Sequence, residues 1–188
     1  VHNLVGNHDV FGVSTKSNVT SSDPKYGKGM FEDRIGKRYY SFTHKGWKFI
    51  ALDSVFITKE KGYIGRIDDD QMTWLTHELA STPKDQPLIV ATHIPLVTGF
   101  LQYIAQRGPS ETMIVTNANE VLDLLWPYNL KAVLQGHTHI RENVTYNGCQ
   151  FITSGAVCGN WWKGKRMGHP EGFGVLTEID VKQTMKAK

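Results

Sequence analysis

Three short segments rich in apolar residues carry the strongest pattern in this chain. Residues 1–5, 88–91 and 132–134 are short apolar runs, and a polar cluster follows each of them. A short apolar run that does not alternate is typical of a strand buried on both faces of a sheet. We therefore predict three buried strands, each of which delivers polar side chains at its C-terminal end.

Other segments have the period of half-buried strands or amphipathic helices. Residues 38–44 and 47–53 alternate around Lys45-Gly46, which predicts a hairpin. Asp68 and Gln71 are spaced as a capping pair, and Asn117 and Glu120 repeat this spacing, so a helix is predicted after each. Further strands are predicted at 143–146, 150–153 and 173–179. The order of strands and helices predicts an α/β fold.

The chain reads as one domain. Its 188 residues can bury a substantial core, and we find neither an internal repeat nor a linker that would divide residues 1–188. Residues 12–37 are predicted to form a long surface loop with a helical turn near residues 30–34, and residues 97–118 are a long mixed segment without a clear period. Function is therefore expected in the loops and packing in the strands.

Composition excludes several classes of protein. With 40% hydrophobic and 21% charged residues and a net charge of +3, the chain resembles an ordinary globular domain. Its lysines and arginines are dispersed, which argues against a nucleic-acid polymer as partner. No apolar run is long enough to predict a membrane span. Cys149 and Cys158 are too few for a disulfide framework, and we predict buried free thiols.

The candidate chemistry lies in three clusters, each directly after a predicted buried strand: Gly6-Asn7-His8-Asp9, Thr92-His93 and Gly136-His137-Thr138-His139. Imidazole nitrogens and amide oxygens bind divalent metal ions. Strands of an open α/β sheet gather such side chains at their carboxyl ends. Alone, Gly-Asn is an ordinary turn and a single histidine is more often a core or surface residue. Together, the clusters predict a metal site.

This pattern resembles that of the calcineurin-like metallophosphoesterases, whose later motifs read Gly-Asn-His-(Asp/Glu), a lone His after a strand, and Gly-His-x-His. The resemblance implies a two-sheet αββα sandwich and metal-dependent hydrolysis of a phosphoester. The family's earlier motifs, Asp-x-His and Gly-Asp-x-x-Asp, do not occur in this chain. We therefore expect the C-terminal part of a catalytic domain, without its N-terminal strands and helices.

The resemblance also implies a role for each candidate residue. Asn7, His93 and His137 would bind one metal, and His139 would bind a second. His8 would protonate the leaving oxygen, and Asp9 would orient and stabilise its imidazole. The metals implied are divalent Mn, Fe or Zn.

In the intact family site, two such ions about 3.5–4 Å apart activate a shared hydroxide for attack on phosphorus. This chain matches three ligands for one ion and a single ligand for the other. We expect weak binding of one metal, loss of the second, and an incomplete site in this chain alone.

The expected substrate is a small phosphodiester or nucleotide-type phosphoester. The alternative is a non-catalytic binding or interaction domain that keeps the fold but not the dinuclear centre. Exposed sheet edges could also pair between chains, so a homo-oligomer is a further hypothesis.

A tail segment adds a clue to substrate and location. Trp161-Trp162-Lys163-Gly164, followed by residues 168–173, resembles a segment of secreted or periplasmic bacterial members of the superfamily, which favours such a location over the cytoplasm. The two indoles could stack a base or sugar, or they could anchor the loop on the core. Lys163, Lys165 and Arg166 could attract a phosphate or could be a solvated surface.

Overall fold

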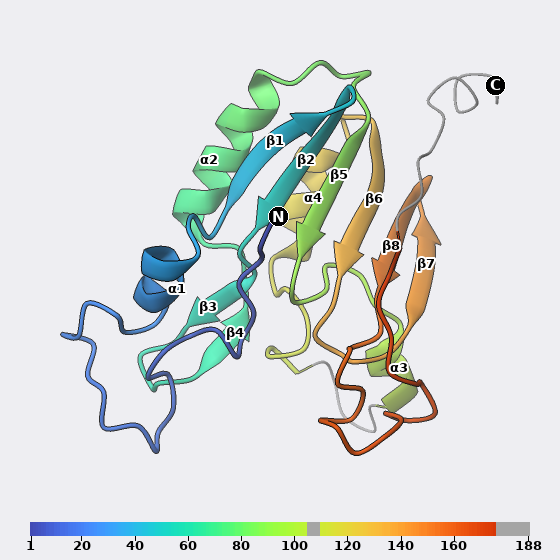
Figure 1. Ribbon diagram of the computed structural model, residues 1–188. Coiled ribbons are helices and arrows are strands. Elements are labelled where there is room, and N and C mark those ends of the chain that lie inside the picture. The colour runs from blue at the N-terminus through green and yellow to red at the C-terminus, as the bar shows by residue number, and fades with distance from the viewer. Residues whose placement is uncertain (105–109, 176–188) are drawn as a thin grey trace.

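The computed structural model describes residues 1–104 and 110–175 and contains one large and one small sheet (Figure 1). The large sheet has the strand order β1-β2-β5-β6-β8-β7, and the small one pairs β3 with β4. Its strands are β1 (Tyr40–His44), β2 (Trp47–Leu52), β5 (Leu88–Thr92), β6 (Leu130–Gln135), β7 (Glu142–Tyr146) and β8 (Cys149–Thr153). The small sheet comprises β3 (Val55–Ile57) and β4 (Tyr63–Gly65). The predicted α/β fold with two sheets is confirmed.

The centre of the large sheet is parallel and its two edges are antiparallel. Strands β2, β5, β6 and β8 run in one direction, so their carboxyl ends meet at one edge of the sheet. Strand β1 pairs with β2, and β7 pairs with β8, each as an antiparallel hairpin. The loops that follow β5 and β6 are consequently neighbours, as a shared ligand site requires.

Helices cover one face of this sheet. The helices are α1 (Gly29–Arg34), α2 (Asp69–Ala80), α3 (Phe100–Ile104) and α4 (Ala118–Leu125), and α2 and α4 lie behind the sheet in Figure 1. Apolar side chains of the strands alternate toward these two helices and form the main core with them, as Val90 and Phe151 do against Leu75 and Leu125. Burial of these side chains is the dominant stabilisation of the fold.

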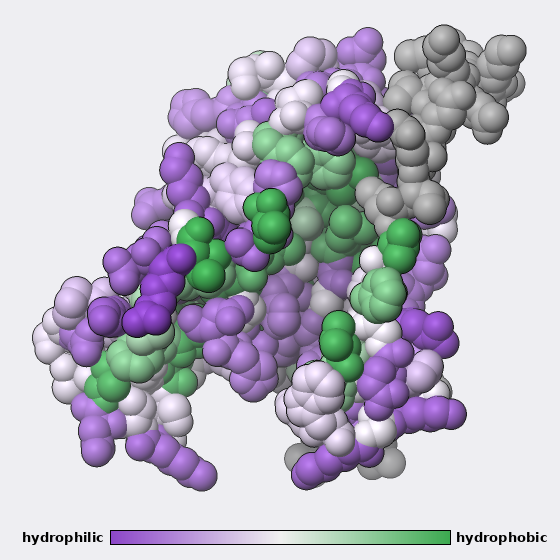
Figure 2. Space-filling model, in the orientation of Figure 1, coloured by the Kyte–Doolittle hydropathy of each residue, from purple (hydrophilic) through white to green (hydrophobic). Residues whose placement is uncertain are grey.

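The opposite face of the sheet carries a second apolar group that, among the described elements, no helix covers. Trp47, Ile89 and Ala132 form its centre, and the half-buried Phe49 and Leu134 pack against them. Figure 2 shows apolar side chains gathered on this face, over the upper part of the sheet. We refer to these five residues as the open face.

The predicted strand at residues 1–5 is wrong, because no strand is present there. Its backbone makes no ladder hydrogen bond to any strand in the described residues. Side chains hold the segment instead: His2 stacks on Phe42, Tyr40 donates from its hydroxyl to the carbonyl oxygen of Asn3 at 3.0 Å, and Val5 is fully buried. Asn7 is thus delivered by an irregular segment that crosses in front of the sheet (Figure 1).

The two predicted helices are present, but their capping differs. Asp68 caps α2 by accepting from the backbone N–H of Gln71 at 2.9 Å, as predicted. The predicted second cap is wrong, because the side chain of Asn117 makes no cap hydrogen bond. It instead bonds to both backbone groups of Ile67, at 3.1 and 3.0 Å. Asn117 is buried, and a buried amide left without partners would be costly, so its bonds to Ile67 replace the cap.

Some elements were not expected and one prediction is untested. The small sheet and α3 fall in segments without a clear period, because each is only 3–5 residues long. No strand is present at residues 173–175, and the rest of the strand predicted at 173–179 lies outside the described residues. None of the helices in the described chain has the length and apolarity needed to cross a membrane.

The cysteines agree with the prediction of free thiols. Both are unbridged; Cys149 is buried and Cys158 is half-buried. Cys149 belongs to the main core, and burial raises the pKa of its thiol to about 11. Cys149 therefore has a packing role.

Candidate metal centre

The site forms where the loops after β5 and β6 meet the irregular N-terminal segment. His93 directly follows β5, and His137 follows β6 by two residues. The backbone N–H of Gly136 donates to the carbonyl oxygen of His93 at 3.0 Å, which joins the two loops. His137 and His139 both adopt left-handed backbone, with φ of 70° and 61°. Such conformations are uncommon for non-glycine residues and are often found at functional sites.

Three of the predicted ligands converge. Nε2 of His93 lies 2.8 Å from Oδ1 of Asn7, Nδ1 of His137 lies 3.1 Å from the same oxygen, and the two ring nitrogens are 3.2 Å apart. Donors that each lie about 2.1 Å from one ion are themselves separated by roughly 3 Å. The triangle of two nitrogens and one oxygen therefore has the dimensions of a metal-binding donor set.

A glycine makes this approach possible. A Cβ atom on Gly6 would lie 3.1 Å from Cε1 of His93 and 3.3 Å from Oδ2 of Asp9. The backbone N–H of Gly6 donates to that same carboxylate oxygen at 2.8 Å. Asp9 therefore closes the turn that presents Asn7 to the two imidazoles.

Burial keeps the two imidazoles neutral. Desolvation, with a smaller contribution from the neighbouring His137, lowers the pKa of His93 from its usual 6.5 to about 4. The pKa of His137 is also lowered to about 4, again chiefly by desolvation. A neutral imidazole is the form that binds a metal ion. The site is therefore ready to bind a cation near neutral pH without first losing protons.

These shifts predict a loss of stability in mild acid. Between pH 6.5 and 4 the unfolded chain protonates both imidazoles, whereas the folded chain does not. The unfolded state then binds more protons, so the free energy of unfolding decreases as the pH falls. We expect the metal-free chain to lose about 2 kcal/mol or more between pH 7 and 4.5, measured by urea unfolding. His93→Gln should show a smaller loss; an identical loss would contradict the assignment.

The donor set passes a chemical test for a divalent ion. Nε2 of His137, which is not one of the three converging atoms, is buried and has no hydrogen-bond partner among the described residues. No cluster of three His, Cys, Asp or Glu side chains suited to a metal is present in residues 1–104 and 110–175. The third donor is instead the amide oxygen of Asn7, which suits ions that accept mixed nitrogen and oxygen ligands.

His139, His8 and Asp9 lie around this triangle and not within it. Nδ1 of His139 donates to the carbonyl oxygen of Gly159 at 2.7 Å, which fixes the tautomer and leaves Nε2 as the lone-pair nitrogen. His8 is exposed on the turn of residues 6–9, and its charge contributes to lowering the pKa of both His93 and His137.

Sequence reasoning missed Tyr63, on β4. Its phenol lies near the side chain of Asn7, and burial raises the pKa of its hydroxyl. Its ring also meets that of His137 edge-on, with centroids 6.3 Å apart. Tyr63 therefore packs next to two of the three converging side chains. The only signal in the sequence was a short run between Gly62 and Gly65.

The fold and the donor set define an α/β protein with a candidate metal site at the carboxyl ends of its parallel strands. A calcineurin-like phosphoesterase family model matches residues 1–141, and the chain belongs to this family. The predicted metallophosphoesterase fold is thereby confirmed, and membership implies the use of divalent metals at the level of the family.

Curated relatives are similar over most of this chain. Serine/threonine-protein phosphatase CPPED1 of Mus musculus is 29% identical over 154 residues, which cover 81% of this chain and 45% of that protein. The 3′,5′-cyclic adenosine monophosphate phosphodiesterase CpdA of Escherichia coli K12 is 27% identical over 157 residues, covering 82% and 49%. The chain thus spans about half the length of these relatives.

Solved structures show more distant likeness. A dimetal phosphatase from Danio rerio aligns with a TM-score of 0.46 and 18% identity, covering 67% of this chain and 51% of that one. The phosphopantetheinyl hydrolase of Mycobacterium tuberculosis aligns with a TM-score of 0.45 and 14% identity, covering 81% and 68%.

Proposed function

We propose that this site belongs to a metal-dependent phosphoesterase that hydrolyses a small phosphodiester or a nucleotide-type phosphoester. The observation that carries the proposal is the convergence of Asn7, His93 and His137, whose donor atoms lie 2.8–3.2 Å apart. The relatives named as a phosphatase and a cyclic nucleotide phosphodiesterase support the same reaction class. The activity of the whole protein is part of this proposal.

Asn7, His93 and His137 would hold a divalent ion, and Nε2 of His139 would face a second. Mn, Fe or Zn bound there would supply an activated water and neutralise charge on the phosphoryl oxygens. The protein's own contribution is to hold the donors in place before binding, because Asp9 closes the turn that carries Asn7 and burial keeps both imidazoles neutral.

His8 is proposed as the acid that protonates the leaving oxygen. It is exposed on the turn next to Asn7, where an ester bound at the metal would lie within its reach. Asp9 is proposed to stabilise the protonated imidazole. Its carboxylate is already fixed by the backbone N–H of Gly6 at 2.8 Å, so its charge stays beside His8. A periplasmic or secreted location remains part of the same proposal.

The first test is hydrolysis of bis-p-nitrophenyl phosphate by this chain with added Mn²⁺. Turnover by this chain would show that the matched ligands suffice, and it should fall at least about 100-fold in His137→Ala, because metal ions contribute several kcal/mol to such transition states. No turnover in either protein would mean that the site in this chain alone is incomplete. His77→Ala, which removes an exposed histidine of α2, should retain full activity. Equal turnover, above the uncatalysed rate, in wild type and His137→Ala would contradict the proposed centre.

A non-catalytic binding domain is the second candidate. It is favoured by the small donor set, since the described residues contain no cluster of three His, Cys, Asp or Glu ligands. This candidate predicts that the chain binds Mn²⁺ and a phosphoester but does not turn the ester over. The hydrolysis assay, run beside a metal-binding measurement, separates the two functions.

A further inference from the structure

The loop of residues 158–169 packs against the turn that carries His137 and His139. The ring of His139 lies 4.9 Å from that of Trp161, centroid to centroid, and its Nδ1 donates to Gly159. Arg166 donates from Nε to the carbonyl oxygen of Thr138 at 3.0 Å. The loop is thereby fixed beside the candidate metal ligands by three separate contacts.

Two adjacent tryptophan side chains of this loop are exposed to solvent. Trp161 is 49% exposed and Trp162 is 79% exposed. Both have left-handed backbone, with φ of 51° and 64°. The ring of Trp162 makes no ring contact with any described residue, so it does not anchor the loop on the core. Exposed indoles on strained backbone are costly, and such costs are typical of binding sites.

The side chain of Arg166 lies next to one of the two indoles. The guanidinium carbon of Arg166 lies 4.9 Å from the ring centroid of Trp161. Among the described residues the only hydrogen-bond acceptor of this side chain is Thr138, which leaves its terminal N–H groups for a ligand. Arg166 also lies close enough to contribute to the lowered pKa of His137. A guanidinium so placed can bind a phosphoryl oxygen of a group held at the metal site.

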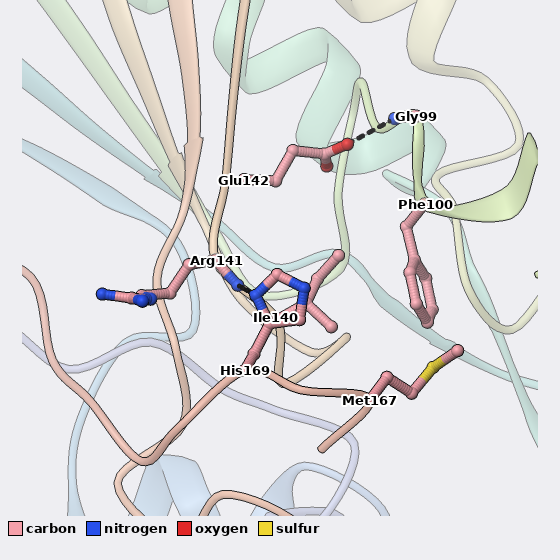
Figure 3. Close-up of a pocket in the computed structure, with 7 residues that line it drawn as sticks. All are labelled: Gly99, Phe100, Ile140, Arg141, Glu142, Met167 and His169. Carbon is pink, nitrogen blue, oxygen red and sulfur yellow. Dashed lines mark hydrogen bonds between the residues drawn. The ribbon is translucent and has the colours of Figure 1, made fainter. Parts of the chain in front are cut away.

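A cavity of about 240 Å³ at the end of this loop is a weaker candidate. Figure 3 shows Phe100, Ile140 and Met167 around it, with the side chain of Arg141 pointing away. The carboxylate of Glu142 is already occupied by the backbone N–H of Gly99, at 2.7 Å. This polar group of the cavity is therefore already hydrogen-bonded within the protein. A drug-sized ligand also needs a larger volume than that of this cavity.

We propose that Trp162, the neighbour in the chain of the Trp161 ring that Arg166 contacts, forms a subsite for a nucleotide, in which the base stacks on the exposed indole of Trp162 and Arg166 binds the phosphate. The proposed binding of the phosphate by Arg166 rests on the function proposed above. The proposed stacking of the base on Trp162 does not, because stacking needs only a planar face. Trp162 would thus select nucleotides over phosphoesters that lack a base.

Calorimetric titration with adenosine 5′-monophosphate and with ribose 5-phosphate, in the presence of Mn²⁺, tests the subsite directly. The two ligands share the phosphate and differ in the base. Trp162→Ala should weaken binding of the nucleotide roughly ten-fold or more and leave ribose 5-phosphate within about two-fold. Trp162→Phe should keep most of the affinity, because it keeps a ring. Arg166→Ala should weaken both ligands alike.

Tyr146→Ala, which removes a 61% exposed aromatic ring from β7, is the matched control and should change neither affinity. The subsite is refuted if wild type binds the two ligands equally or binds neither, or if Trp162→Ala weakens both to the same extent. If the nucleotide binds through Trp162 while bis-p-nitrophenyl phosphate is not hydrolysed, the subsite stands and the proposed reaction fails.

Discussion

Replacing His93 with alanine is expected to lower the affinity for Zn²⁺ by more than about 100-fold. Nε2 of His93 touches both other donors, at 2.8 Å from Asn7 and 3.2 Å from His137, so its removal leaves two donors. Even groups that only support metal ligands are worth about 10- to 100-fold in affinity. Isothermal titration with Zn²⁺ measures the change, after removal of metal with a chelator.

His44→Ala is the matched control, because His44 is an exposed histidine on β1. It should bind Zn²⁺ as the wild type does, and the melting temperature of both should rise with Zn²⁺ concentration. If His93→Ala kept the affinity of the wild type, the donor triangle would not be the metal site.

Replacing Asp53 with alanine is expected to lower the free energy of unfolding by about 3–5 kcal/mol. The Asp53 carboxylate is fully buried and pairs with Lys28 and Arg38, whose side chains are only 14% and 19% exposed. It also accepts from the backbone N–H of Val55 at 3.0 Å. The variant would leave two largely buried cations without this partner, and the cost of such an unpaired charge is large. Urea unfolding at pH 7 measures it.

The matched control is an exposed ion pair. Arg66 and Asp69 are 2.9 Å apart, but the aspartate side chain is 90% exposed. Asp69→Ala should change the free energy of unfolding by less than about 1 kcal/mol. If Asp53→Ala and Asp69→Ala lowered the free energy of unfolding by similar amounts, burial of the Asp53 ion pairs would not contribute to stability.

The sequence was most informative where short apolar runs precede polar clusters. The runs at 88–91 and 132–134 became β5 and β6, and their clusters supply His93 and His137. Parallel neighbours align their carboxyl ends, so convergence of these two ligands follows from the fold class. The roles of His8, Asp9 and His139 stay predictions, because no contact in the structure tests them.

The sequence was uninformative where tertiary contacts decide local structure. Residues 1–5 have the composition of a strand, but a strand needs a backbone partner, and the described residues supply none. Asn117 has the spacing of a cap, but the backbone of Ile67 competes for its amide. Tyr63 reaches Asn7 only because a three-residue strand turns it inward, and so short a segment has no periodicity to detect.

The donors of the metal centre come from distant points of the chain. Asn7 and His93 are 86 residues apart, and Asn7 and His137 are 130 residues apart. Contacts of such high contact order form late, because closure of long loops comes before any gain from the contact. The centre therefore cannot form on a partly folded chain: β5 and β6 must pair before two of its ligands meet. Premature capture of metal by a folding intermediate is thus disfavoured by the order in which the chain comes together.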